Sequence, residues 1–120
     1  MSIESILTSQ AKLLCIKAMF SFKRPIHLRR IVSLTGLQPR SVQLALKSLR
    51  SIKFLIQTRK GNKIEYQFNK DFPVFLQIEN FFKELTLLEI KKRSEGYPSF
   101  VDNLQFIEDA HLLINSMKQS

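Results

Sequence analysis

Residues 26–69 have the sequence IHLRRIVSLTGLQPRSVQLALKSLRSIKFLIQTRKGNKIEYQFN, and this stretch decides the fold. Its first half places apolar residues at helical spacing on both sides of Gly36, and its second half alternates apolar and polar residues around a Gly-Asn pair. Gly36 suits the left-handed position that ends a first helix over residues 27–35. Pro39 suits the first position of a second helix over residues 39–53, where its missing N–H costs nothing. The pattern predicts two helices, a short turn between them, and a β-hairpin.

The second helix is expected to have one buried face and one polar, basic face. Val42, Leu46 and Leu49 recur at the spacing of a buried stripe. Gln38, directly before the helix, is a weak N-cap compared with Ser or Asp, a difference of about 1 kcal/mol in helix stability. The rest of the circumference carries Arg40, Ser41, Gln43, Leu44, Lys47 and Arg50.

The hairpin is predicted from a change of periodicity after Phe54. Phe54, Ile56 and Thr58 would share one face of the first strand, and the second strand would carry Ile64, Tyr66 and Phe68 on one face. Gly61-Asn62 can supply the positive φ values of a tight turn. The predicted tip carries three cations, Arg59, Lys60 and Lys63.

Positive charge is concentrated in this central block. Residues 23–70 hold twelve of the nineteen Lys and Arg residues and a single acid, Glu65, whereas residues 71–120 have a net charge of −3. A folded surface with this much local positive charge is typical of proteins that bind a polyanion, and nucleic acid is the leading candidate.

Apolar helices flank the central block, over residues 3–20, 72–94 and about 99–117. The helix over residues 72–94 has apolar residues at alternating spacings of four and three, which is typical of helix pairing and predicts a dimer interface. That predicted interface consists of Val74, Ile78, Phe81, Leu85 and Leu88. We therefore expect a mainly α fold with a small β-hairpin, with residues 1–96 forming one domain and residues 97–120 a helical extension.

The composition argues against several other classes of protein. The single cysteine, Cys15, lies among apolar residues, so a buried structural thiol and a reducing, cytoplasmic location are expected. One cysteine and two distant histidines do not make a metal site. Glu108, Asp109 and His111 are more typical of a solvated helix edge than of an acid–base site. We expect no enzyme activity, no cofactor and no metal.

The sequence also lacks the pattern of a membrane protein. Charged residues interrupt the apolar N-terminal segment before the roughly 18 continuous apolar residues that a membrane span needs. No basic region precedes it, so we expect neither an export signal nor a membrane anchor.

The order of these elements resembles the winged helix-turn-helix transcription regulators, particularly the arsenic-repressor-like (ArsR-like) group. Within that group it is similar to winged-helix proteins found beside or fused to nucleotidyltransferases. The residues that carry this similarity are Thr35-Gly36-Leu37, Pro39-Arg40-Ser41-Val42-Gln43 and Gly61-Asn62, followed by Tyr66, Asn69, Asp71 and Pro73. The family usually has Ser or Thr in place of Gln38 and often Gly in place of Lys53. The resemblance covers about half of the chain.

The resemblance implies that different elements of such a fold contact different parts of double-stranded DNA. The recognition helix would contact bases in the major groove through Arg40, Ser41, Gln43, Leu44 and Lys47. The hairpin, or wing, would contact the backbone or minor groove through Arg59, Lys60 and Lys63, and secondary phosphate contacts would come from Arg29, Arg30 and Arg50. The predicted function is that of a homodimeric, sequence-specific transcription regulator.

Two alternatives remain open at this point. The acidic and apolar C-terminal third is also typical of an adaptor that binds a protein partner, such as a nucleotidyltransferase, through residues 72–117. A winged helix that binds RNA is the other alternative.

Overall fold

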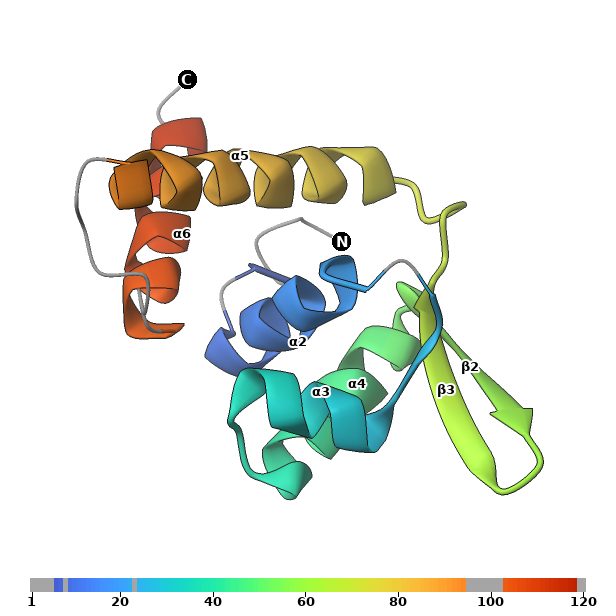
Figure 1. The fold of residues 1–120 in the computed structure, drawn as a ribbon. Coiled ribbons are helices and arrows are strands. Elements are labelled where there is room, and N and C mark those ends of the chain that lie inside the picture. The colour runs from blue at the N-terminus through green and yellow to red at the C-terminus, as the bar shows by residue number, and fades with distance from the viewer. Residues whose placement is uncertain (1–5, 8, 23, 95–102, 119–120) are drawn as a thin grey trace.

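The computed structural model describes residues 6–7, 9–22, 24–94 and 103–118. Figure 1 shows helices α3 and α4 and the β2–β3 hairpin at one end of the molecule, α5 and α6 at the other, and α2 between them. Helices dominate and the strands form one small antiparallel sheet, which confirms the predicted fold class.

Helix α2 (Gln10–Phe20) is shorter than the helix predicted over residues 3–20. Ser9 is extended, with φ −80° and ψ 126°, and its side chain accepts a hydrogen bond from the N–H of Lys12 at 3.3 Å. The predicted continuous helix was therefore wrong at Ser9, because a serine N-cap begins a new helix there although apolar periodicity alone suggested continuity. Ile6 and Leu7, ahead of the cap, are buried in the core; residues 1–5 and 8 lie outside the described residues.

The two central helices and their turn match the prediction closely. Helix α3 (Leu28–Thr35) ends at Gly36, which has a left-handed φ of 71°. The Thr35 side chain accepts a hydrogen bond from the N–H two residues further on, at 3.2 Å, and so holds the turn. Helix α4 (Pro39–Ser51) begins at its proline as expected and ends two residues before the predicted Lys53. Gln38 makes no side-chain cap, as expected of a poor capping residue.

The sheet contains a strand that the sequence did not suggest. Its order is β1 (Ile26–His27), β3 (Lys63–Phe68), β2 (Leu55–Lys60), and both pairings are antiparallel. Strand β1 directly follows Pro25 and has only two residues. It is therefore too short to show an alternation of apolar and polar residues in the sequence. Ile26 lies opposite Tyr66 and is buried, so β1 ties the start of α3 to the wing.

The face that Phe54, Ile56 and Thr58 were predicted to share does not form in β2. Leu55 is buried and Ile56 is 40% exposed, the reverse of the expected alternation. Phe54 is fully buried but lies before the strand, so the pleat begins at Leu55, opposite Phe68. A shift of one residue exchanges the two faces of a strand.

The hairpin turn has the predicted two-residue loop, Gly61-Asn62. Gly61 has a φ of 61°, and it is Gly61 rather than Asn62 that has the positive value. A positive φ at the first loop position is the pattern of a type II′ turn, whose twist matches that of paired strands.

Helix α5 (Phe75–Ser94) crosses the molecule above α2 (Figure 1). It starts three residues later than predicted, since the segment containing Pro73 forms a turn in which the Phe75 N–H donates to the Phe72 carbonyl. Of the predicted dimer interface, Ile78, Phe81 and Leu85 are buried within the chain itself. These three side chains are therefore covered in this conformation. The apolar side chains of α5 that face solvent are Leu76, Leu87, Leu88 and Ile90.

Helix α6 (Asn103–Lys118) packs on α2 and α5 and belongs to the same core. Its buried side chains are Phe106, Ile107, Ala110 and Ile114. The connection between the helices predicted over residues 72–94 and about 99–117, and the start of the second of them, fall outside the described residues. Asp109 is buried, so the expected solvated edge was wrong at that position, although Glu108 and His111 are exposed.

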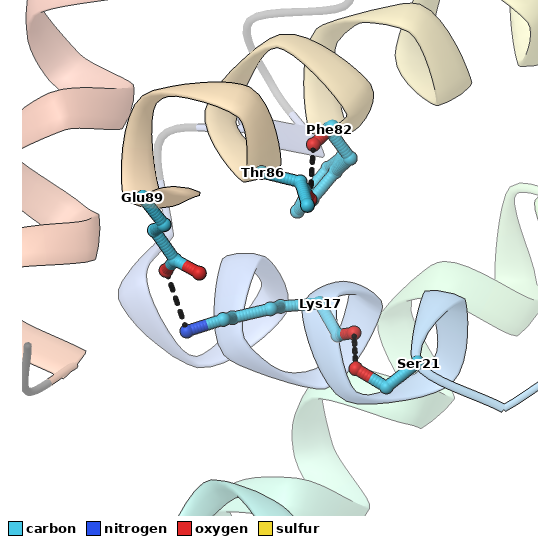
Figure 2. A network of polar contacts seen from close by, with 5 residues as sticks. All are labelled: Lys17, Ser21, Phe82, Thr86 and Glu89. Atoms are coloured by element: carbon cyan, nitrogen blue, oxygen red, sulfur yellow. Dashed lines mark hydrogen bonds and ion pairs between the residues drawn. The ribbon is translucent and has the colours of Figure 1, made fainter. Parts of the chain in front are cut away.

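One lysine joins α2 to both C-terminal helices. Lys17 Nζ lies 3.1 Å from Glu89 Oε1 on α5 and 4.4 Å from the centre of the Phe106 ring on α6. Figure 2 shows the ion pair bridging α2 and α5, with the Thr86 hydroxyl donating to the Phe82 carbonyl in the same region. A cation is attracted both to a carboxylate and to the face of an aromatic ring, so this contact joins α5 and α6 to α2.

The connection from α4 to the wing is unusual at Lys53. Lys53 has a φ of 69°, in the left-handed region that glycine adopts without strain. Its carbonyl accepts a hydrogen bond from the Asn69 side chain at 2.9 Å, and the Asn69 N–H donates to the Phe54 carbonyl at 3.0 Å. Asn69 thus holds two of the three residues that connect α4 to β2.

Replacing Lys53 with glycine should stabilise the protein. Relief of the left-handed strain outweighs the greater entropy of an unfolded glycine, and we expect the free energy of unfolding to rise by about 0.5–1 kcal/mol. Urea unfolding followed by circular dichroism would measure it. Lys47→Gly, within α4, is the matched control and should lower the same quantity by about 1 kcal/mol. A loss of stability in Lys53→Gly would contradict the left-handed geometry.

Cys15 is fully buried in α2, as predicted, and burial raises the pKa of its thiol from 9.0 to about 12. The folded protein should therefore resist a disulfide reagent such as dithionitrobenzoate at pH 8, while the urea-unfolded chain reacts rapidly. The raised pKa contributes to the free energy of unfolding. This contribution is fully present below pH 9 and is lost as the pH rises from 9 towards 12. Rapid reaction of the folded protein would show that the thiol is accessible.

Candidate nucleic-acid interface

The exposed face of α4 brings five predicted residues together. At 100° per residue, Arg40, Gln43, Leu44, Lys47 and Arg50 fall within about 120° of the helix circumference, and all five are exposed. The opposite face is buried, with Val42, Ala45, Leu46 and Leu49 each at most 5% exposed. Ser41 lies at the flank and is half-buried. The buried face therefore fixes which side chains α4 presents to solvent.

Leu44 stands out on this face because it is apolar and 55% exposed. An apolar side chain among Arg, Gln and Lys suits contact with a thymine methyl group more than it suits solvent. One face of α4 thus presents a guanidinium that can donate two parallel hydrogen bonds, a side-chain amide and an apolar side chain that can contact a methyl group.

The wing tip concentrates positive charge on both sides of the hairpin. Lys60 and Lys63 lie directly opposite each other across the two-residue turn, and Arg59 lies opposite Ile64 on the other face. All three cations are exposed. Opposed like charges destabilise a hairpin, and Glu65, 3.7 Å from Lys60 Nζ, offsets part of that repulsion.

Polar contacts connect α4 to the wing. The Arg50 guanidinium near the end of α4 donates a hydrogen bond to the Gln57 side-chain oxygen on β2. Asn69, at the end of β3, holds the carbonyl of Lys53 as described above. Arg50, predicted as a phosphate contact, therefore also holds the wing against α4.

The two arginines of α3 differ in their surroundings. Arg29 and Arg30 are both exposed, as contact with phosphate requires. The Arg30 guanidinium lies 4.9 Å from the centre of the Phe22 ring, so part of its surface covers an aromatic side chain. Arg29 is the stronger candidate of the two for a phosphate contact.

All predicted cations lie on α3, α4 and the hairpin, at the end of the molecule away from α5 and α6 (Figure 1). None of them lies beneath the C-terminal helices, since each is exposed. The elements that carry these side chains form one end of the fold.

Sequence reasoning missed two contributors to this end of the molecule. Gln57 was not considered, although its place on β2 opposite Tyr66 brings it within reach of Arg50. Lys53 was taken as the last residue of the recognition helix, yet it is an exposed cation in the turn that follows. The family's frequent glycine at that position was the available signal for a left-handed residue.

Other kinds of site find little support in the described part of the chain. Among residues 6–7, 9–22, 24–94 and 103–118, no three His, Cys, Asp or Glu side chains gather where they could hold a metal ion. No helix within those residues has the length and apolarity needed to span a bilayer.

The fold is a winged helix-turn-helix: α3 and α4 with their tight turn, and a β2–β3 wing beside them. It is similar to an apo form of a ZitR variant from Lactococcus lactis, with a TM-score of 0.52 and 16% sequence identity, over 98% of this chain and 86% of that one. At that identity the similarity shows the fold alone. No protein-family model matches the sequence, and none of the curated proteins compared with it is significantly similar.

Two further structures align less well. The Giardia lamblia Hop2–Mnd1 complex matches with a TM-score of 0.43 and 16% identity over 92% of this chain and 81% of that one. Human N-acetylserotonin methyltransferase, in complex with SAM, matches with a TM-score of 0.49 and 16% identity over 57% of this chain, which spans only 20% of the enzyme.

Proposed function

We propose that this protein is a sequence-specific, double-stranded-DNA-binding transcription regulator that acts as a homodimer. The observation that carries the proposal is the exposed face of α4, where Arg40, Gln43, Leu44 and Lys47 share one side of a helix that the core holds rigidly. A helix of this kind fits the major groove, and these side-chain types distinguish base edges there.

Each residue has a defined role in the proposal. Gln43 bonds adenine in bidentate fashion, Arg40 bonds guanine or a phosphate, and Leu44 packs on a thymine methyl group. Ser41 and Lys47 make further contacts with bases or with the nearby backbone. Wing residues Arg59, Lys60 and Lys63 contact the adjacent backbone or minor groove, and Arg29, Arg30 and Arg50 contact phosphates.

The dimer is proposed to form at the opposite end of the molecule. Leu87, Ile90 and Leu112 are 55–68% exposed on α5 and α6, although they are large and apolar, and Leu88 of the predicted interface is 36% exposed on α5. A second copy would cover this surface. Pairing would present two recognition helices to a two-fold symmetric site.

The proposal includes no enzyme activity, and it keeps the cytoplasmic location predicted from the sequence. The second candidate is an adaptor that binds a nucleotidyltransferase or another protein through the same α5 and α6 surface. The exposed Leu87, Ile90 and Leu112 favour it equally, so the oligomeric state and DNA binding of the pure protein separate the two.

DNA affinity should depend steeply on salt. With about six phosphate contacts in the bound state, the association constant should fall on the order of a thousandfold between roughly 50 and 200 mM salt. Fluorescence anisotropy on a duplex chosen by selection from random DNA would measure this. A nearly constant affinity over that range would contradict a phosphate-dominated interface.

Changing α4 and changing the wing should have different effects. Gln43→Ala should reduce discrimination between the selected and a random duplex by roughly 1–3 kcal/mol, because a bidentate base contact is lost. Lys63→Ala should weaken binding to both duplexes alike. Lys63 is a cleaner probe than Lys60, whose removal also leaves Glu65 without its ion-pair partner.

Gln77→Ala is the matched control for both changes, because Gln77 is an exposed glutamine on α5, outside α3, α4 and the wing. Anisotropy on the two duplexes gives all the constants. Equal losses on both duplexes for Gln43→Ala would remove Gln43 from the base-contacting set.

The double change Leu87→Glu and Ile90→Glu should convert a dimer into a folded monomer. Both side chains face solvent in the single chain, so the added charges disrupt a contact between chains without disturbing the core. Analytical ultracentrifugation would measure the mass. Leu34→Glu, an exposed leucine on α3, is the control and should leave the mass unchanged. A wild-type protein that is monomeric and does not bind DNA would favour the adaptor.

A further inference from the structure

A groove of about 800 Å³ lies between α2, β3 and α5, outside the surface proposed to contact DNA. That volume is within the range typical of small-molecule sites, roughly 300–1,000 Å³. Six aromatic side chains line it: Phe20, Phe22, Tyr66, Phe68, Phe75 and Phe82. The groove is therefore mainly apolar and large enough for a small organic ligand.

The aromatic floor is held in place by ring contacts. The Phe20 ring stacks on that of Phe68 with centroids 4.4 Å apart, and it lies 5.2 Å from Phe82 and 6.2 Å from Phe75. Phe75 and Phe82 are buried, whereas Phe20 and Phe68 remain partly exposed. A floor made of packed rings is preformed, so a ligand would not have to order it.

The rim of the groove is positively charged. Arg24, Lys70 and Lys83 line it together with one carboxylate, Glu79, which lies 3.8 Å from Lys83. All three cations are exposed and come from three different segments, ahead of β1, after β3 and on α5. The surplus of positive charge beside an apolar floor selects for a ligand with an apolar body and an anionic head.

We propose that this groove binds an amphipathic organic anion, a single carboxylate on an alkyl or aryl body. The body lies on the aromatic floor, where its burial supplies most of the affinity. The carboxylate accepts hydrogen bonds from the cations of the rim, with Arg24 able to donate two in parallel. The groove shares Leu87 with the proposed dimer surface but none of the side chains proposed to contact DNA, and it can be tested without DNA.

Three probes separate the roles of head and body in calorimetric titrations of the full chain, below micelle-forming concentrations. Dodecanoate and 2-naphthoate carry the carboxylate on an alkyl and an aryl body, and dodecyltrimethylammonium carries the opposite charge on the dodecanoate chain length. We expect one site per chain, with at least one carboxylate binding tenfold or more tightly than the ammonium. The tighter carboxylate identifies the body. Equal binding of both head groups, or no saturable binding, would overturn the proposal.

Charge reversal on the rim tests the location. Arg24→Glu with Lys70→Glu should weaken carboxylate binding at least tenfold. Lys12→Glu with Lys91→Glu makes the same change in charge at residues that do not line the groove, and should alter it less than twofold. Equal losses in the two double variants would mean general electrostatic attraction and would overturn the site.

A filling variant provides a test that does not rely on charge. Thr86 lines the groove and is exposed, and its hydroxyl bonds only a carbonyl of its own helix among the contacts drawn in Figure 2. Thr86→Phe should keep the circular dichroism spectrum and block all three probes. Unchanged carboxylate binding in a folded Thr86→Phe protein would place the ligand elsewhere.

Discussion

The burial of Phe54 fixes how the wing lies against α4. Its ring is fully buried and meets Phe68 and Phe72 edge-on, at centroid distances of 5.5 and 5.2 Å. Its N–H donates to Leu49 near the end of α4, and its carbonyl accepts from Asn69 after β3. One residue therefore joins α4, β3 and the start of α5 through both its ring and its backbone, and the strained Lys53 before it is the conformational cost of that placement.

The molecule separates two kinds of surface. At one end, α4 and the wing present exposed cations and polar side chains on elements that the core holds rigidly. At the other end, Lys17 ties α5 and α6 to α2 through Glu89 and the Phe106 ring. The aromatic groove lies between these ends and is walled by β3 and α5. A change at the groove would thus first affect β3 of the wing and α5, the helix that carries the exposed apolar surface.

The sequence predicted the parts of the fold that depend on local chemistry. Gly36, Pro39 and the Gly61-Asn62 loop each occupy the position that their backbone preferences indicated. The buried stripe of α4, with Val42, Leu46 and Leu49, follows from spacing alone. Periodicity was therefore sufficient to assign the exposed face of α4.

The sequence failed where tertiary contacts decide the outcome. Ile78, Phe81 and Leu85 have the spacing of a helix pair, but spacing does not distinguish a partner in another chain from α2 and α6 in the same chain. Which side chains of β2 face the core depends on whether the strand begins at Phe54 or at Leu55. The left-handed backbone of Lys53 determines that starting point. Strand β1 is too short to show any pattern, and the groove brings together residues from three separate segments.

The sheet order has a consequence for solubility. Strand β3 is paired on both sides, whereas β2 has a single partner among the described residues, so it forms an edge with unpaired backbone groups. An open edge invites pairing with the same strand of another molecule, and lysine and arginine side chains oppose such pairing by repulsion. Arg59 and Lys60 occupy the last two positions of that edge, so the wing's charges also protect the free protein from edge-to-edge aggregation.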